Sequence, residues 1–245
     1  MKQSKFLSVF FLLVGLSFFS KSDAICGKVD VAAALVDLDI LESGKTIKTL
    51  HMKGVKADAT IAVYQGLSIK PSFLWCQGHG VLNSGSLAVG YYLPLFEKLK
   101  FLPNVGVTWS YLHTRYDIPE VELFHLKERF RSTTPFVGLE VYYSITKKLS
   151  LFAIYQYGWA RTHTKIRTKR EDKTGLHPGA IALGLTDKNQ TDKSHSCGPN
   201  YGIGLDYCFD DHWSVNIAFG YNITLSHEKH GLRGKGGKLG VGYYF

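Results

Sequence analysis

The sequence predicts an all-β fold, a transmembrane, antiparallel up-and-down β-barrel, and three observations lead to that prediction. Apolar and small polar side chains alternate along many segments, with no helical period between them. An export signal precedes these segments, and no later apolar run reaches the roughly 20 residues that a spanning helix needs. The chain ends on an alternating, aromatic segment that stops at Phe245. Besides helices, only a closed barrel satisfies every backbone group in lipid.

Residues 1–24 are expected to be a cleaved signal peptide. A short basic start precedes an apolar run over residues 6–19, and the small residues Ser22 and Ala24 place the cut after Ala24. Cleavage leaves residues 25–245, a length that fits one domain.

Alternation assigns ten strands to the remaining chain. Each segment places apolar or aromatic residues on one face and mostly Gly, Ser, Asn and Thr on the other, which suits lipid outside and a crowded interior. In chain order the predicted strands cover residues 28–41, 58–65, 67–77, 87–93, 99–109, 137–143, 149–159, 201–209, 213–226 and 238–245. A soluble lipid-carrying barrel would instead show long charged side chains on its outside.

The number of strands depends on the region before the third of them. Asp37 and Asp39 interrupt the apolar pattern of the first strand, and eight strands follow if residues 25–57 form an N-terminal periplasmic arm. Ten strands are preferred because residues 29–41 are too apolar for a free arm.

A spacing of ten residues from Leu to Trp occurs twice, in Leu99–Trp109 and Leu149–Trp159, with a shorter copy in Leu67–Trp75. Ten residues at about 3.3 Å each, tilted by about 40°, rise roughly 25 Å, which is the height of a lipid-facing band. Each Leu would then mark the inner interface. The tryptophans Trp75, Trp109 and Trp159 would form the outer aromatic girdle.

The lengths of the connections predict the orientation. Short connections near residues 94–98, 145–148 and 210–212 would face the periplasm, together with both ends of the mature chain. The long polar connections near residues 117–134, 167–199 and 227–237 would be extracellular loops. A lumen of this width is usually filled by side chains. Those expected to fill it are Lys70, Lys100, Asn104, Glu140, Gln156, Asp206 and Asn216.

The signal peptide, the repeated hairpins and the Gly-Val-Gly-Tyr-Tyr-Phe ending resemble those of small Gram-negative outer-membrane β-barrel proteins of the OmpA, OmpW and opacity types. The resemblance implies a β-barrel fold and a location in the outer membrane. It says little about activity, because one fold can carry many functions. In that group the last strand resembles the signal that the barrel-assembly machinery reads. The corresponding residues here are Leu239, Val241, Tyr243 and Phe245.

The chain has four cysteines, an even number that makes disulfides plausible in an exported protein. Cys26 and Cys208 lie near predicted periplasmic ends of strands, whereas Cys76 and Cys197 lie near outer ends. The favoured pairs are therefore Cys26–Cys208 and Cys76–Cys197, because a bridge needs Cα atoms within about 7 Å. Unpaired thiols or links between molecules are the alternative. Zinc does not fit the cysteine spacing.

No catalytic residue and no cofactor are predicted. Asp210-Asp211-His212 resembles the Asp and His residues that the omptin barrel proteases use, but it falls in a predicted periplasmic turn, the wrong end for that chemistry. Ser110 and His113 would lie on opposite faces of their strand and cannot form a local pair.

Basic outer loops carry the functional prediction. The expected ligand-binding residues are Arg161, Lys165, Arg167, Lys169, Arg170, Lys229 and Arg233, in a chain of formal net charge +9. Such loops attract lipopolysaccharide phosphates, sulfated host sugars or acidic proteins, and the attraction weakens with salt. Nucleic acid is not an expected partner at this location. The predicted function is a non-enzymatic adhesin or structural antigen; a narrow porin for small solutes is the alternative, and an outer-membrane hydrolase comes third.

Overall fold

A computed structural model describes residues 26–64, 66–117, 124–170, 189–227 and 229–245. The signal peptide predicted for residues 1–24 lies outside the described residues. The described chain forms eleven strands: β1 (Gly27–Glu42), β2 (Lys45–Tyr64), β3 (Leu67–Gly78), β4 (Gly80–Tyr91), β5 (Leu93–Phe96), β6 (Leu99–Asp117), β7 (Phe124–Ser144), β8 (Leu149–Arg170), β9 (Asn189–Cys208), β10 (Trp213–Leu225) and β11 (Gly231–Tyr244). This part of the chain holds no helix long and apolar enough to cross a membrane.

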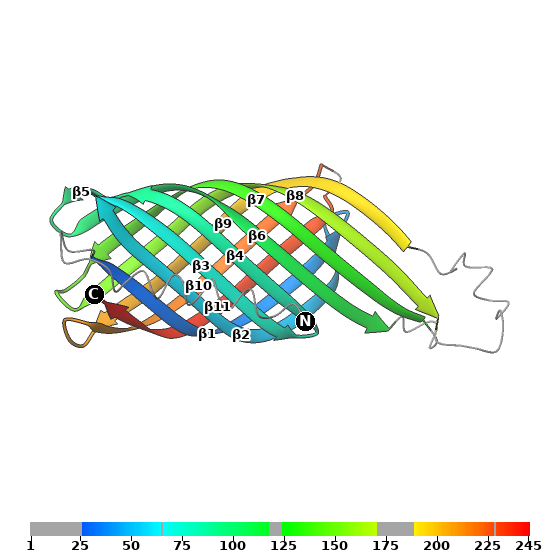
Figure 1. Cartoon of the computed structure of the whole chain (residues 1–245), viewed down its shortest axis with the longest axis horizontal. Helices are drawn as coiled ribbons and strands as arrows, with labels where there is room; N and C mark the ends of the chain where they lie inside the picture. Colours follow the sequence, from blue (N-terminus) through cyan, green and yellow to red (C-terminus); the bar gives the residue numbers. More distant parts are fainter. Residues whose placement is uncertain (1–25, 65, 118–123, 171–188, 228) are drawn as a thin grey trace.

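Ten long strands close into a barrel. Figure 1 shows the closed cylinder that they form. Neighbours in sequence pair antiparallel, β11 pairs with β1, and β4 pairs with β6. The short β5 pairs only with β6, at the edge of the barrel. The prediction of ten strands is confirmed. The eight-strand alternative is wrong, because β1 and β2 form part of the wall rather than an arm.

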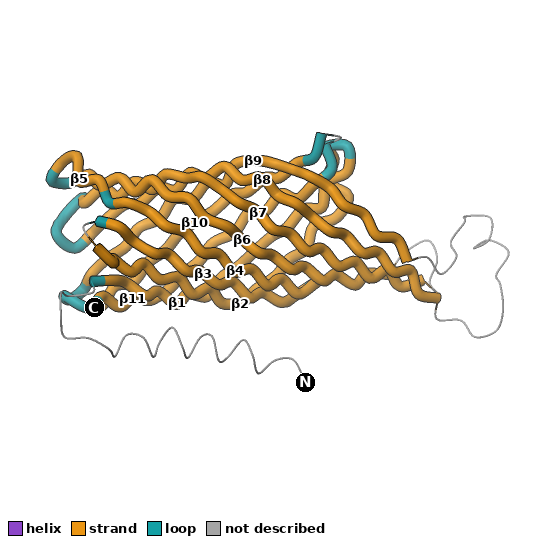
Figure 2. The backbone as a smooth tube through the Cα atoms, turned by 45° about the horizontal axis from the view of Figure 1, so that its top comes forward, coloured by secondary structure: helices purple, strands orange, loops and turns teal. Residues whose placement is uncertain are grey.

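The two ends of the barrel differ in their connections (Figure 2). The terminal end holds the first residue of β1, the last residues of the chain and the turns at 97–98, 145–148 and 209–212. Gly27 and Phe245 exchange backbone hydrogen bonds of 2.9 and 3.0 Å there. The opposite, extended end holds a tight turn at Ser43-Gly44, where both residues have positive φ, as a two-residue hairpin requires. Which end faces the cell exterior remains a prediction.

Strands β6 to β9 run past the rest of the wall at the extended end, where Figure 1 shows them projecting. We call this region the projecting sheet: residues 111–117 of β6, 124–133 of β7, 161–170 of β8 and 189–196 of β9. The predicted boundaries of the long loops are therefore mostly wrong, because much of each predicted loop is strand. Their described residues pair as strands up to Phe124↔Arg170 and Arg167↔Asn189, and β11 already begins at Gly231.

The outside of the wall is apolar, as alternation predicts. Leu239, Val241, Tyr243 and Phe245 all lie on the exposed face of β11 and its end, with Leu239 58% exposed. Strand β11 pairs with β1 from Lys28↔Tyr244 to Leu41↔Gly231, so the last strand closes the cylinder.

The lumen near the terminal end is filled by a polar network. Glu140 pairs with Lys70 and accepts hydrogen bonds from Tyr142 at 2.7 Å and Asn104 at 3.2 Å. Similar contacts join Lys28 to Asp30 and Asp206, Lys238 to Asp58, Asn216 to Asp30, and Asn200 to Gln156. The expected lumen residues are thus found in contact inside the barrel, except Lys100, which is exposed.

Toward the extended end the interior becomes apolar, which alternation did not predict. Leu38, Leu50 and Met52 alternate with outward-facing neighbours and pack with the buried Ala34, Ile40, Cys76 and Leu112. The side chains of Leu74, Leu82, Phe130 and Leu232 lie against this cluster. The lumen therefore has two layers, a polar one and an apolar one.

The predicted disulfides are absent, since all four cysteines are free thiols. Cys76 is buried in the lumen and Cys197 is exposed. Their strands β3 and β9 are separated by β2, β1, β11 and β10. Cys26 and Cys208 do share the terminal end, but β1 and β9 lie three strand spacings of about 4.8 Å apart, beyond the reach of a bridge.

Candidate polyanion-binding surface

Cross-strand register brings basic residues of β7, β8 and β9 side by side in the projecting sheet. Arg129 lies opposite Lys165, and Arg131 lies opposite His163. On the other side of β8, His163 lies opposite Lys193, and Arg161 lies opposite His195. Residues opposite each other have Cβ atoms about 5 Å apart, so these side chains form one continuous grid.

All of these residues point away from the barrel axis. They occupy the same alternate positions as Trp109, Trp159 and Tyr201, whose side chains are exposed on the outer wall. Intervening positions such as Glu128 are buried on the inner side. We call this outward set the cationic face: Arg129, Arg131, Arg161, Lys165 and Lys193, with His113, His163 and His195.

The cationic face is not neutralised by its own residues. Among the side chains that the structure describes, no carboxylate lies on it. Arg131 has one stabilising neighbour, because its guanidinium lies 5.7 Å from the centre of the Tyr111 ring. Like charges directly opposite each other in a sheet destabilise the pairing. An anion bound from outside would relieve that repulsion.

The spacing of the face suits a ligand with repeated negative charge. Alternate residues of one strand are about 6.6 Å apart, and neighbouring strands are about 4.8 Å apart. Phosphate or sulfate groups on a flexible sugar chain can reach several of these cations at once. Arg adds bidentate hydrogen bonding to such groups.

The sequence prediction found part of this surface. Arg161 and Lys165 belong to the cationic face, but on strand β8 rather than in a loop. Arg167, Lys169 and Arg170 also belong to β8, and their side chains lie outside the described ones. Arg129, Arg131 and Lys193 were missed. The sequence pattern that could have identified these three residues is the alternation of basic and polar residues, which occurs in stretches that were predicted to be loops.

Lys229 and Arg233 do not join the cationic face. Lys229 lies in the turn between β10 and β11, where its carbonyl accepts a hydrogen bond from Gly44 at 2.9 Å. Arg233 donates to Asp39 through Nε at 2.9 Å and Nη2 at 2.7 Å, and also to Thr46. Because Asp39 is buried, this pair is a structural contact of the wall. Arg233 therefore lies on strand β11 rather than in the predicted loop, and its guanidinium is engaged by Asp39. Its predicted role in ligand binding stays a prediction.

The predicted girdle residues Trp75, Trp109 and Trp159 are exposed on the outer wall. Trp213 and Tyr243 are exposed too, near the terminal end, with ring centres 4.9 Å apart. The depth of these rings in a membrane stays a prediction.

In the turn at 209–212, the Asp210 side chain has a structural role. Asp210 accepts hydrogen bonds from the backbone N–H groups of His212 at 2.8 Å and Trp213 at 2.6 Å. These bonds hold the pKa of Asp210 below its usual value. The Asp210 side chain is therefore engaged by the backbone of its own turn.

Comparison with protein families identifies one model, described as Pom: Protochlamydia outer membrane protein, which matches residues 77–235. No curated protein matches the chain.

Several solved structures are similar to this chain at low sequence identity. The outer membrane protease OmpT from Escherichia coli is 12% identical over 92% of this chain and 99% of its own, with a TM-score of 0.57. The translocator domain of autotransporter NalP from Neisseria meningitidis is 12% identical over 99% of this chain and 96% of its own, with a TM-score of 0.46. Ail, the attachment invasion locus protein of Yersinia pestis, is 14% identical over 91% of this chain and 100% of its own, with a TM-score of 0.39.

Proposed function

Because this chain belongs to the Pom family of Protochlamydia outer-membrane proteins, we propose that it is a non-enzymatic outer-membrane barrel that binds polyanions through its cationic face. The ligand class is a sugar chain bearing several phosphate or sulfate groups, from lipopolysaccharide or from a host surface.

One observation carries this proposal, namely the outward grid of Arg129, Arg131, Arg161, Lys165 and Lys193 on paired strands. Paired strands hold the cations at regular spacing, so binding them costs less ordering entropy than binding a flexible loop. Lys70 and Glu140, by contrast, are engaged with each other inside the barrel.

The proposal includes an orientation. The extended end would face outside and the terminal end the periplasm, since short turns gather at the periplasmic end of bacterial barrels. The row Leu239, Val241, Tyr243 and Phe245 would then be the part that the barrel-assembly machinery reads before β11 closes on β1.

Retention on immobilised heparin tests the proposal. A variant with Arg129→Gln, Arg131→Gln, Arg161→Gln and Lys165→Gln should elute at a clearly lower salt concentration than the unchanged protein, because exposed charges act through a screened attraction. The matched control changes exposed lysines of terminal-end turns, Lys98→Gln with Lys147→Gln, and should elute as the unchanged protein does.

One further measurement identifies the source of the ligand, and one outcome of the heparin test would contradict the proposal. Binding to vesicles that contain lipopolysaccharide separates a bacterial source of the phosphate from a host source of sulfate. Equal elution of the four-residue variant and the unchanged protein, both folded as judged by their heat-modifiable gel bands, would show that the cationic face binds no polyanion.

A further inference from the structure

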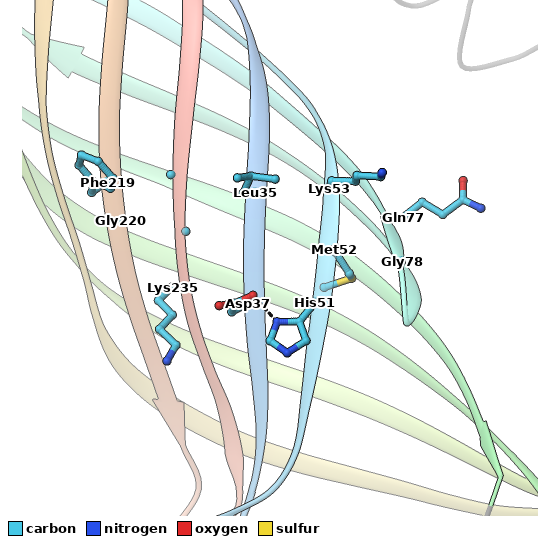
Figure 3. Close-up of a pocket in the computed structure, with 12 residues that line it drawn as sticks. Leu35, Asp37, His51, Met52, Lys53, Gln77, Gly78, Phe219, Gly220 and Lys235 are labelled. Carbon is cyan, nitrogen blue, oxygen red and sulfur yellow. Dashed lines mark hydrogen bonds and ion pairs between the residues drawn. The ribbon is translucent and has the colours of Figure 1, made fainter.

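A groove of about 690 Å³ lies on the outer wall, across the neighbouring strands β3, β2, β1, β11 and β10. Figure 3 shows Leu35 and Phe219 on either side of it, with Asp37, His51 and Lys235 nearby. Leu35 and Phe219 are 67% and 61% exposed, which is unusual for large apolar side chains unless they face lipid. The groove lies away from the cationic face, which is on β6 to β9.

Missing side chains create the groove. Gly237 lies opposite both Leu35 on β1 and Phe219 on β10, so the middle position of this row is empty. A Cβ at Gly237 would lie 3.4 Å from the Phe219 ring. The neighbouring Gly236 also lines the groove. The result is a trough along β11 with apolar walls.

The trough becomes charged toward the extended end. Asp37 lies opposite Lys235 on one side and His51 on the other. The His51 ring nitrogen Nδ1 lies 2.7 Å from Asp37 Oδ1, so that carboxylate already has a partner. Within the described part of the chain, neither Lys53 nor Lys235 forms a salt bridge. Lys235 lies in the row of Asp37, and Lys53 lies in the adjacent row, opposite Leu35. Both ammonium groups are exposed and available to an anion.

We propose that the groove binds one membrane lipid with an anionic phosphate headgroup. An acyl chain would lie over Gly236 and Gly237 between Leu35 and Phe219, and the phosphate would contact Lys53 and Lys235. Two features favour a lipid over a soluble anion. The trough continues the exposed apolar row of Leu239 and Val241 on the same strand. The apolar side chains of Leu35 and Phe219 lie beside Lys53 and are followed along the wall by Lys235, so one lipid can make apolar and cationic contacts together.

Native mass spectrometry of the complete processed protein tests this site. The protein is loaded with equal amounts of bis-phosphorylated lipid A and zwitterionic phosphatidylethanolamine. The unchanged protein should keep one lipid A molecule in clear preference to phosphatidylethanolamine. Lys53→Gln with Lys235→Gln should weaken lipid A retention at least tenfold, because both phosphate contacts are lost.

Two more variants separate the groove from general charge. Gly237→Leu keeps both lysines but fills the trough, and it should also lose retention at least tenfold. Lys98→Gln with Lys147→Gln removes two charges from terminal-end turns and should retain lipid A as the unchanged protein does. A heat-modifiable gel band checks the fold of each variant; if Gly237→Leu fails to fold, the Lys53 and Lys235 variant decides.

Three results would overturn the inference. They are equal retention of the two lipids by the unchanged protein, undiminished lipid A retention by the folded Lys53 and Lys235 variant, or an equal loss in the Lys98 and Lys147 variant. The last would mean that charge anywhere on the surface suffices. Heparin has no acyl chain, so its retention tests the cationic face, whereas preference for lipid A over phosphatidylethanolamine tests the groove. Failure of this inference therefore leaves the proposed function standing, and the reverse also holds.

Discussion

At the scale of single residues, the size of inward side chains decides whether the lumen can close. Gly242 lies on the inner face of β11, where a Cβ would be 2.5 Å from Asp30 Oδ1 and from Lys28 Cε. Gly234 is on the same face of the same strand, yet a Cβ there would meet Leu38 Cδ1 at 3.7 Å, an ordinary contact. A Cβ at Gly242 would therefore have to displace the ends of the Asp30 and Lys28 side chains.

Gly242→Ala should destabilise the barrel by about 1–3 kcal/mol, because the added methyl group displaces members of the ion-pair network. Urea unfolding of protein refolded in detergent measures the change. Gly234→Ala is the matched control and should stay within about 0.5 kcal/mol of the unchanged protein. Equal stability of the two variants would contradict the view that the terminal layer of the lumen is tightly packed.

Arg233 shows where residue-scale prediction from sequence fails. Its partner Asp39 lies 194 positions earlier in the chain and becomes its neighbour only because β1 pairs with β11. No local pattern distinguishes such a cation from one that is free for a ligand. The alternation of Leu239 and Val241, in contrast, is a local property of one strand, and it predicted their outward placement correctly.

At the scale of elements, strand boundaries were predicted better at the terminal end of the barrel than at the extended end. Strands β3, β6 and β8 begin at Leu67, Leu99 and Leu149, the first residues of the Leu-to-Trp spacing. Where strands leave the lipid, both faces meet water and apolar alternation stops, although backbone pairing goes on. The region from 161 to 170 therefore looked like a loop, and most of the cationic face was hidden with it.

Hydrogen exchange should show that the projecting sheet is a folded element. Amides of residues 129–133 and 161–165 pair across β7 and β8, so they should exchange at least tenfold more slowly than amides of the turn at 145–148. Amides of the barrel wall, such as those of residues 137–143, serve as the protected reference. Exchange of 129–133 as fast as in the turn would restore the loop interpretation and remove the rigid spacing on which the cationic face depends.

At the scale of the whole molecule, two different layers close one lumen. In the apolar layer Leu50 and Cys76 have no exposed surface, and in the terminal half the same holds for Leu102, Ser68 and Ser214. A side chain with no accessible surface is not in contact with solvent, so these inward side chains do not line a water-filled path. A narrow porin needs a continuous water path past both layers, so this packing favours a surface function over conduction.

Purified protein in planar bilayers should accordingly show no steady single-channel conductance at neutral pH. Leu50→Ala with Leu112→Ala removes bulk from the apolar layer but leaves Lys70, Glu140 and their partners in place, so it should remain closed as well. Insertion of the folded protein is checked separately. Protein recovered from the vesicles that supply the planar bilayer should give a heat-modifiable gel band. Steady channels from the unchanged protein would overturn the closed-lumen interpretation and favour the porin alternative. Channels from the double variant alone would assign the seal to the apolar layer, which would make that layer, rather than the ion pairs, the barrier that a solute must cross.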